Sequence, residues 1–155
     1  MKTRQILGYA GVIPFLLGIY FSTGNFNVGI HKTLPFIAYS AVILSFLAGS
    51  LWKVYMIHPY ESNEKQRMYL EHDSFSQQQI VSNIISALAF LCILISPEIS
   101  LLLLAIGYLF IWFYERRING INSFDELPEN YLSMRTHLTF IVFSLHMLAY
   151  MLWFL

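Results

Sequence analysis

Five apolar runs follow one another along this chain of 155 residues, and they constrain its fold more than any other feature. Each run is close to the roughly 17–25 residues that a helix needs to cross a bilayer. Backbone N–H and C=O groups in lipid must pair within their own segment, so the runs predict helices and not strands. We expect five transmembrane helices, at residues 6–22, 34–57, 77–96, 97–116 and 130–155.

The composition supports one integral membrane domain over residues 1–155. Hydrophobic residues make up 57% of the chain and charged residues only 12%, against about 25% charged residues in soluble domains. The net charge is zero, which gives no indication of a nucleic-acid partner. We expect polar cytosolic loops at residues 58–76 and 117–129, although the polar stretch 60–79 also suits a surface helix.

Local signals mark several helix ends. Ser74 with Gln77 fits a capping box at the start of the third helix. Ser96 suits the N-cap of the fourth helix, with Pro97 as its first residue. So short a link predicts an antiparallel hairpin of the third and fourth helices. Gly120 is typical of a C-cap after the fourth helix.

The basic residues are divided unequally between the two sides of a five-helix bundle. One side receives eight of the nine: Lys2, Arg4, Lys53, Lys65, Arg67, Arg116, Arg117 and Arg135. Only Lys32 falls on the opposite side. The positive-inside rule therefore predicts a cytosolic N-terminus and an external C-terminus.

The first apolar run also has the basic flank of a secretory signal, in Lys2 and Arg4. The run is long for the apolar part of a signal and no clear cleavage site follows it, so we expect an uncleaved first helix. No Arg- and Ser-rich transit peptide precedes it, which favours a bacterial inner membrane over an organelle.

Several segments carry a family resemblance. They are residues 9–15 (YAGVIPF), residues 39–49 (YSAVILSFLAG) with Trp52, the ending Glu115-Arg116-Arg117, and Leu127-Pro128 with Tyr131, Arg135, Leu138 and Thr139. Together they resemble the bacterial membrane family called domain of unknown function 3429, related to mitochondrial transmembrane protein 69. The chain departs from that pattern at Lys53, at Asn130 and in the long stretch 60–79. The family has no agreed activity, so the resemblance implies the fold and little about function.

Charged residues gather at the expected cytosolic end of the bundle. Lys53 and Glu115 are a candidate ion pair, which would leave Arg116, Arg117 and Arg135 facing the interface. These cations predict either ordinary topology anchoring with anionic-lipid contact or a defined anion- or headgroup-binding site formed with Lys53.

His146 is the one ionisable residue expected well inside the bilayer, where such residues are functional candidates. Thr139 and Tyr150 share its helical face, and Tyr39 or Ser40 are the expected hydrogen-bond partners. A neutral, satisfied histidine is one interpretation; proton relay or haem ligation are the others.

Cofactor and metal signatures are not found in the sequence. His137 and His146 are nine residues apart and face opposite sides of their helix. A bis-histidine haem within one chain is therefore not expected, whereas one shared with a partner chain stays open. The single cysteine, Cys92, predicts no internal disulfide. We expect no cofactor and no metal.

Small residues recur on the first two helices. Gly11 and Gly18 lie on the first, and Ala41, Ser45 and Gly49 recur every four residues on the second. Such faces let helices approach closely. They predict packing within the bundle or a docking face for a partner's helix.

These observations favour a non-enzymatic role: an accessory, assembly or stabilising subunit of a membrane complex, acting through helix–helix contacts. The expected partners are the lipid bilayer and a membrane protein or further copies of the chain, without nucleic acid. An alternative is a small oligomeric transporter or channel with His146 as its titrating group. A third is a membrane enzyme that handles lipid or quinone.

Overall fold

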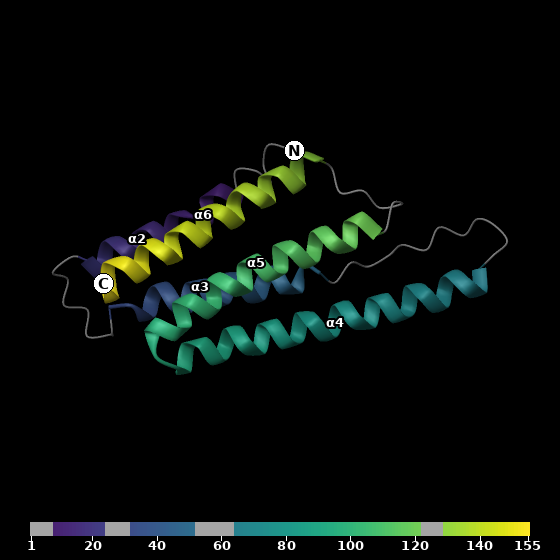
Figure 1. Cartoon of the computed structure of the whole chain (residues 1–155), viewed down its shortest axis with the longest axis horizontal. Helices are drawn as coiled ribbons and strands as arrows, with labels where there is room; N and C mark the ends of the chain where they lie inside the picture. Colours follow the sequence, from purple (N-terminus) through teal and green to yellow (C-terminus); the bar gives the residue numbers. More distant parts are fainter. Residues whose placement is uncertain (1–7, 24–31, 52–63, 122–128) are drawn as a thin grey trace.

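The computed structural model of the chain describes residues 8–23, 32–51, 64–121 and 129–155, and within these ranges its elements are helices (Figure 1). They are α2 Ile13–Thr23, α3 Leu34–Gly49, α4 Glu64–Leu94, α5 Pro97–Ile121 and α6 Glu129–Phe154. A helical turn at residues 8–10 precedes α2. The described part of the chain contains no strand, as the sequence predicts.

Among the described helices, three are long and apolar enough to cross a membrane. Their apolar segments are Gln77–Leu94, Pro97–Arg117 and Ser133–Phe154. The apolar helices Gly8–Thr23 and Leu34–Gly49 are shorter. With 16 residues at about 1.5 Å each, α3 is about 24 Å long, short of the roughly 30 Å hydrocarbon core. The three long helices indicate a membrane protein, and the other two spans stay predictions.

Successive helices run in alternating directions, and α4 and α5 form a tight hairpin (Figure 1). α3 packs against α2, α4 and α5, while α6 packs against α5 and α2. This arrangement places the end of α5 and the start of α6 at the same end of the bundle (Figure 1). Residues far apart in sequence are therefore neighbours at each end.

Large apolar side chains cover the outside of the bundle as well as filling its core. Phe15, Phe36 and Leu104 are at most 1% exposed. On the outer surface, Phe46 is 73% exposed and Leu94 is 68% exposed. A soluble protein rarely presents so much apolar surface, whereas lipid solvates it well.

The helices α2 and α5 approach α3 closely at two glycines. A Cβ at Gly107 of α5 would lie 2.8 Å from Leu44 Cδ2, too close without a shift of the leucine. A Cβ at Gly18 of α2 would lie 3.3 Å from the side chain of Phe36. The absent side chains at these positions let α3 occupy the centre of the bundle.

The structure corrects two expected helix boundaries, the start of the third expected helix and the end of the fourth. α4 begins at Glu64, so most of the expected loop 58–76 is helix and Ser74 lies inside it rather than at a cap. The stretch 64–76 has no Gly or Pro and is rich in strong helix formers, so the helix continues although its apolar pattern ends. α5 likewise continues to Ile121, with Gly120 in its last turn.

Other boundaries agree with the sequence or lie outside the described ranges. α5 begins at Pro97, directly after Ser96, as predicted. α3 begins at Leu34 and is described to Gly49. The predicted continuation of this helix to residue 57 falls on residues 52–57, outside the described part of the chain.

Candidate functional site

Two polar clusters lie along α6, and the first is a buried ion pair between α5 and α6. The Nε of Arg135 donates to Oε2 of Glu115 at 2.9 Å. Their side chains are only 10% and 7% exposed. Glu115 lies near the end of the apolar segment Pro97–Arg117, and Arg135 lies near the start of Ser133–Phe154. The pair therefore lies at the edge of both spans.

The guanidinium of Arg135 is only partly satisfied by this contact. Its Nη2 is buried and has no hydrogen-bond partner within the part of the chain that the structure describes. The contact with Glu115 uses Nε alone, unlike the two-pronged pairing that arginine and carboxylate often form. A buried N–H left unpaired costs about 1–3 kcal/mol, and more in a charged group.

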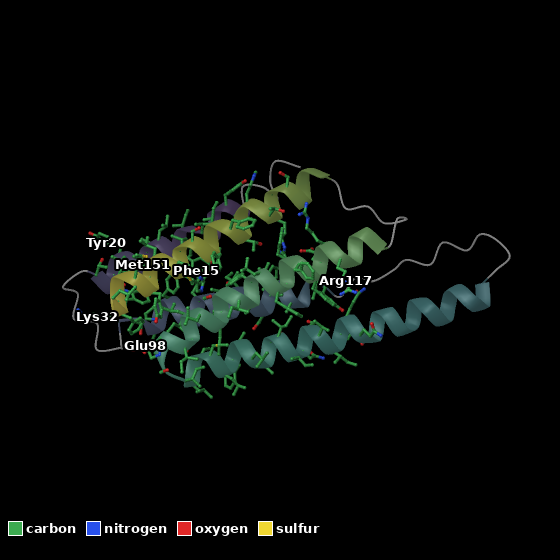
Figure 2. All side chains as sticks on the ribbon, in the orientation of Figure 1. Phe15, Tyr20, Lys32, Glu98, Arg117 and Met151 are labelled. Atoms are coloured by element: carbon green, nitrogen blue, oxygen red, sulfur yellow. The ribbon has the colours of Figure 1, made fainter. Side chains whose placement is uncertain are left out.

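Further cations and an indole surround the pair. Trp112 Nε1 donates to Thr136 Oγ1 at 3.0 Å, which ties α5 to α6 beside Arg135. The guanidinium carbon of Arg116 lies 5.2 Å from the centroid of the Trp112 ring, a cation–π arrangement. Arg116 and Arg117 are exposed, and Arg117 lies at the end of the bundle opposite Lys32 and Glu98 (Figure 2).

The structure brings together only some of the residues predicted to form the anion site. Arg116, Arg117 and Arg135 come to one end of the bundle, whereas Lys53 lies outside the described residues. The predicted Lys53–Glu115 pair is therefore untested, and Glu115 bonds to Arg135. Sequence reasoning missed this partner, although both residues lie near the ends of apolar runs on consecutive helices of opposite direction.

The second cluster centres on His146 in the core of the bundle. His146 is 0% exposed, as is Ser40 of α3. The imidazole Nε2 lies 2.8 Å from Ser40 Oγ, and Nδ1 lies 2.8 Å from the backbone carbonyl of Val142. Tyr108 of α5 donates its hydroxyl to the Ser40 carbonyl at 2.9 Å. The cluster thus links α3, α5 and α6.

A neutral imidazole satisfies both hydrogen bonds of His146. The Val142 carbonyl only accepts, so the Nδ1 of His146 carries the proton, which leaves Nε2 to accept from the Ser40 hydroxyl. The rings of Phe15 and Phe36 lie 5.8 Å and 5.0 Å from the imidazole, centroid to centroid. The arrangement is that of a closed core network, with aromatic rings around it.

The other residues predicted near His146 have separate contacts. Thr139 Oγ1 donates to the backbone carbonyl of Arg135 in its own helix at 2.9 Å. The ring of Tyr150 packs on Phe154. Tyr39 donates its hydroxyl to the carbonyl of Gly11 at 3.0 Å, so Ser40 alone of the two expected partners contacts the histidine. Tyr108 was missed, because a tyrosine in an apolar run carries no distinctive signal.

The small residues of α2 and α3 pack mainly inside the chain. Ala41 is 2% exposed, and Gly18 faces Phe36. Ser45 is half-buried. Gly49 is the exception, since no atom of the described residues lies within 4 Å of the position of an added Cβ. The open part of the predicted docking face is thus its end at Gly49.

The described side chains form no cluster of three or more His, Cys, Asp or Glu that could hold a metal ion. Cys92 is a buried free thiol. The buried carboxylate, guanidinium and imidazole groups of the described residues, in Glu115, Arg135 and His146, all lie in the two clusters along α6.

No curated protein and no solved structure matches the chain. One family model does match, over residues 1–151, and its description is a protein of unknown function, DUF3429. The match covers nearly the whole chain and agrees with the resemblance carried by the segments in the first, second, fourth and last helices. This membrane-type helical chain belongs to the DUF3429 family.

Proposed function

We propose that this protein is a non-enzymatic subunit that assembles with other membrane proteins and acts through helix–helix contacts. The observation that carries the proposal is the length of α4. α4 has 31 residues, and its N-terminal part extends well past the ends of α3 and α5 (Figure 1). No described helix lies beside this part of α4 (Figure 1). An isolated polar helix is only marginally stable in water, so a partner surface would account for its stability.

The proposed topology is five spans, with a cytosolic N-terminus and an external C-terminus, in a bacterial inner membrane. The described charges support it. Arg117 lies at the end of the bundle where α5 ends and α6 begins, and Lys32 lies at the other end (Figure 2). Among the cations whose side chains are described, Arg116, Arg117 and Arg135 lie at the first end and Lys32 lies at the other (Figure 2). The positive-inside rule predicts this bias for a cytosolic face. The extension of α4 is then cytosolic.

The surroundings of His146 favour this role over transport. A titrating group in a transporter needs access to water from at least one side. His146 is fully buried, and both ring nitrogens have hydrogen-bond partners within the chain. The same closed packing gives little support to a lipid- or quinone-handling enzyme at this position.

The test is purification of the tagged full-length chain from its native membrane in a mild detergent, with identification of every stoichiometric component by mass spectrometry. The proposal predicts one heterologous membrane protein at a fixed ratio. A proline at Met68, inside the α4 extension, removes a helical hydrogen bond and breaks the helix. We expect Met68→Pro to lose the partner and remain in the membrane.

The matched control is Met68→Ala, which keeps the helix and should keep the partner. A particle that contains only copies of this chain would contradict the proposal. Equal partner recovery from Met68→Pro and wild type would show that the α4 extension does not make the contact.

A further inference from the structure

Glu115 holds the guanidinium of Arg135 in place but accepts a hydrogen bond from only its Nε. A guanidinium has five N–H donors, and the contact with Glu115 uses the one on Nε. Nη2 is buried without a partner among the described residues. Buried donors in native proteins almost always have an acceptor. The two N–H groups of Nη2 therefore point to an acceptor that is not part of the described chain.

The depth of this guanidinium indicates which acceptors can reach it. Arg135 lies two residues inside the apolar segment Ser133–Phe154, and Glu115 lies two residues inside Pro97–Arg117. The pair is thus at the boundary between the apolar part of the bundle and its charged end, the level at which phospholipid headgroups lie. The Arg135 side chain keeps 10% of its surface exposed, so it is not sealed from this level.

The charge around the pair favours an anion over water. Glu115 pairs with Arg135, and neither Arg116 nor Arg117 has an ion pair among the side chains that the structure describes. Among side chains that the structure describes, no second carboxylate lies at this end, since Glu98 is at the other (Figure 2). Trp112 holds Arg116 by its ring and Thr136 by its indole N–H, so the positive charge of Arg116 is held near Arg135.

We propose that Arg135 binds a phosphate oxygen of an anionic phospholipid headgroup, with Arg116 contributing to the positive field. Planar guanidinium N–H groups match phosphate oxygens in geometry and charge. Glu115 is a positioning residue, because its bond to Nε fixes the orientation in which Nη2 faces the ligand. The site is independent of any protein partner and requires only the membrane setting.

The test is native mass spectrometry of the delipidated full-length protein, titrated with phosphatidylglycerol and, separately, with phosphatidylcholine. Wild type should retain one phosphatidylglycerol per chain in preference to phosphatidylcholine. Arg135→Gln should weaken this retention by about tenfold, the loss expected for a hydrogen bond between charged groups. Arg135→Lys keeps the charge without the planar donors, so its lipid retention should lie between that of wild type and that of Arg135→Gln.

Two variants separate binding from folding and from net charge. Arg117→Gln removes the same charge from an exposed residue and should retain the lipid within about twofold, because exposed charges at this boundary are screened. His146→Ala disturbs the buried core of the bundle away from Arg135, and the folded variant should keep the lipid. Loss in either variant equal to the loss in Arg135→Gln would overturn the proposal, because retention would then follow total charge or folding.

The phosphate oxygen that Arg135 binds could belong to a lipid headgroup or to a free phosphate ion. Thermal unfolding in the presence of inorganic phosphate, without lipid, distinguishes the two. The proposal predicts no protection against thermal unfolding by phosphate alone and clear protection by phosphatidylglycerol. Equal protection by both would overturn the lipid assignment in favour of a soluble anion. Wild-type retention by Arg135→Gln, or no retained lipid on wild type, would overturn the site and leave a bound water as the acceptor.

Discussion

The two polar clusters on α6 use the same helix in different ways. His146 and Arg135 are eleven positions apart, about 16 Å along the helix axis. The His146 cluster is neutral and fully buried, and each of its hydrogen bonds ends within the chain. The Arg135 cluster is charged, lies at the edge of two spans and leaves a buried nitrogen without a partner among the described residues.

The difference indicates which cluster maintains the fold and which is available for a ligand. A polar network inside an apolar core specifies one arrangement of helices when every member is paired. A charged group left incomplete costs stability, and it is explained when something outside the chain completes it. We therefore assign the His146 cluster to folding and the Arg135 cluster to recognition. The predictions below test that division, from the largest effect to the smallest.

Arg135→Met should have the largest effect on stability. It leaves the Glu115 carboxylate buried without its counter-charge, and breaking a buried pair from one side costs about 3–5 kcal/mol. The measurement is the free energy of unfolding in detergent, by chemical denaturation followed with circular dichroism. The double variant Glu115→Gln with Arg135→Met should recover most of the loss. A single variant as stable as wild type would show that the carboxylate is not buried.

His146→Ala should destabilise the protein by about 3 kcal/mol, from the cavity it leaves and from the lost bonds to Ser40 and Val142. The same denaturation experiment measures this. If the cluster serves folding alone, phosphatidylglycerol retention by the folded variant should equal that of wild type. A folded His146→Ala protein of normal stability that has lost its cellular activity would instead place His146 in the function.

Ser40→Ala should cost about 1–2 kcal/mol, because it removes the hydroxyl that donates to Nε2 of a fully buried imidazole. Tyr108→Phe removes the bond to the Ser40 carbonyl and should cost about 1 kcal/mol. The Ser40 and Tyr108 hydroxyl groups lie 3.5 Å apart, so the double variant should lose less than the two single effects added together. Strict additivity would mean that the cluster is not a connected network.

Gly107→Ala should have the smallest effect, about 1 kcal/mol of destabilisation. Its Cβ would lie 2.8 Å from Leu44 Cδ2. The leucine methyl group can move part of the way out of this contact. The added methyl group crowds the contact between α5 and α3, next to Tyr108 and Ser40. Gly49→Ala is the matched control, because the position is open and alanine favours helix. An equal response at both positions would show that close approach at Gly107 is unimportant.

The fold was largely predictable because apolar length is a direct consequence of bilayer thickness. The helical class, the family and the start of α5 at Pro97 follow from the residues. The start of α4 did not, because residues 64–76 are polar and their helical propensity is a weaker signal than apolar periodicity. Ser74 suits a cap by type, yet no nearby Gly or Pro stops the helix before it.

The candidate site was less predictable, because pairing depends on how helices rotate against one another. The cations near the interface could be named from the sequence, but Glu115 had both Lys53 and Arg135 within reach at the same depth. Only the packing of α5 on α6 places Arg135 against it. In the same way, helical spacing grouped Thr139 and Tyr150 with His146, whereas the actual partners come from α3 and α5.

Labelling of single cysteines most directly tests the claim that the Arg135 end faces the cytosol and the His146 cluster lies between the two faces. Cys92 would first be replaced by alanine, and Lys32→Cys and Arg117→Cys introduced separately, since both positions are exposed. A membrane-impermeant maleimide applied to intact spheroplasts should label Lys32→Cys directly, and Arg117→Cys only after permeabilisation. Labelling of both cysteines in intact spheroplasts, or the reverse pattern, would contradict the account.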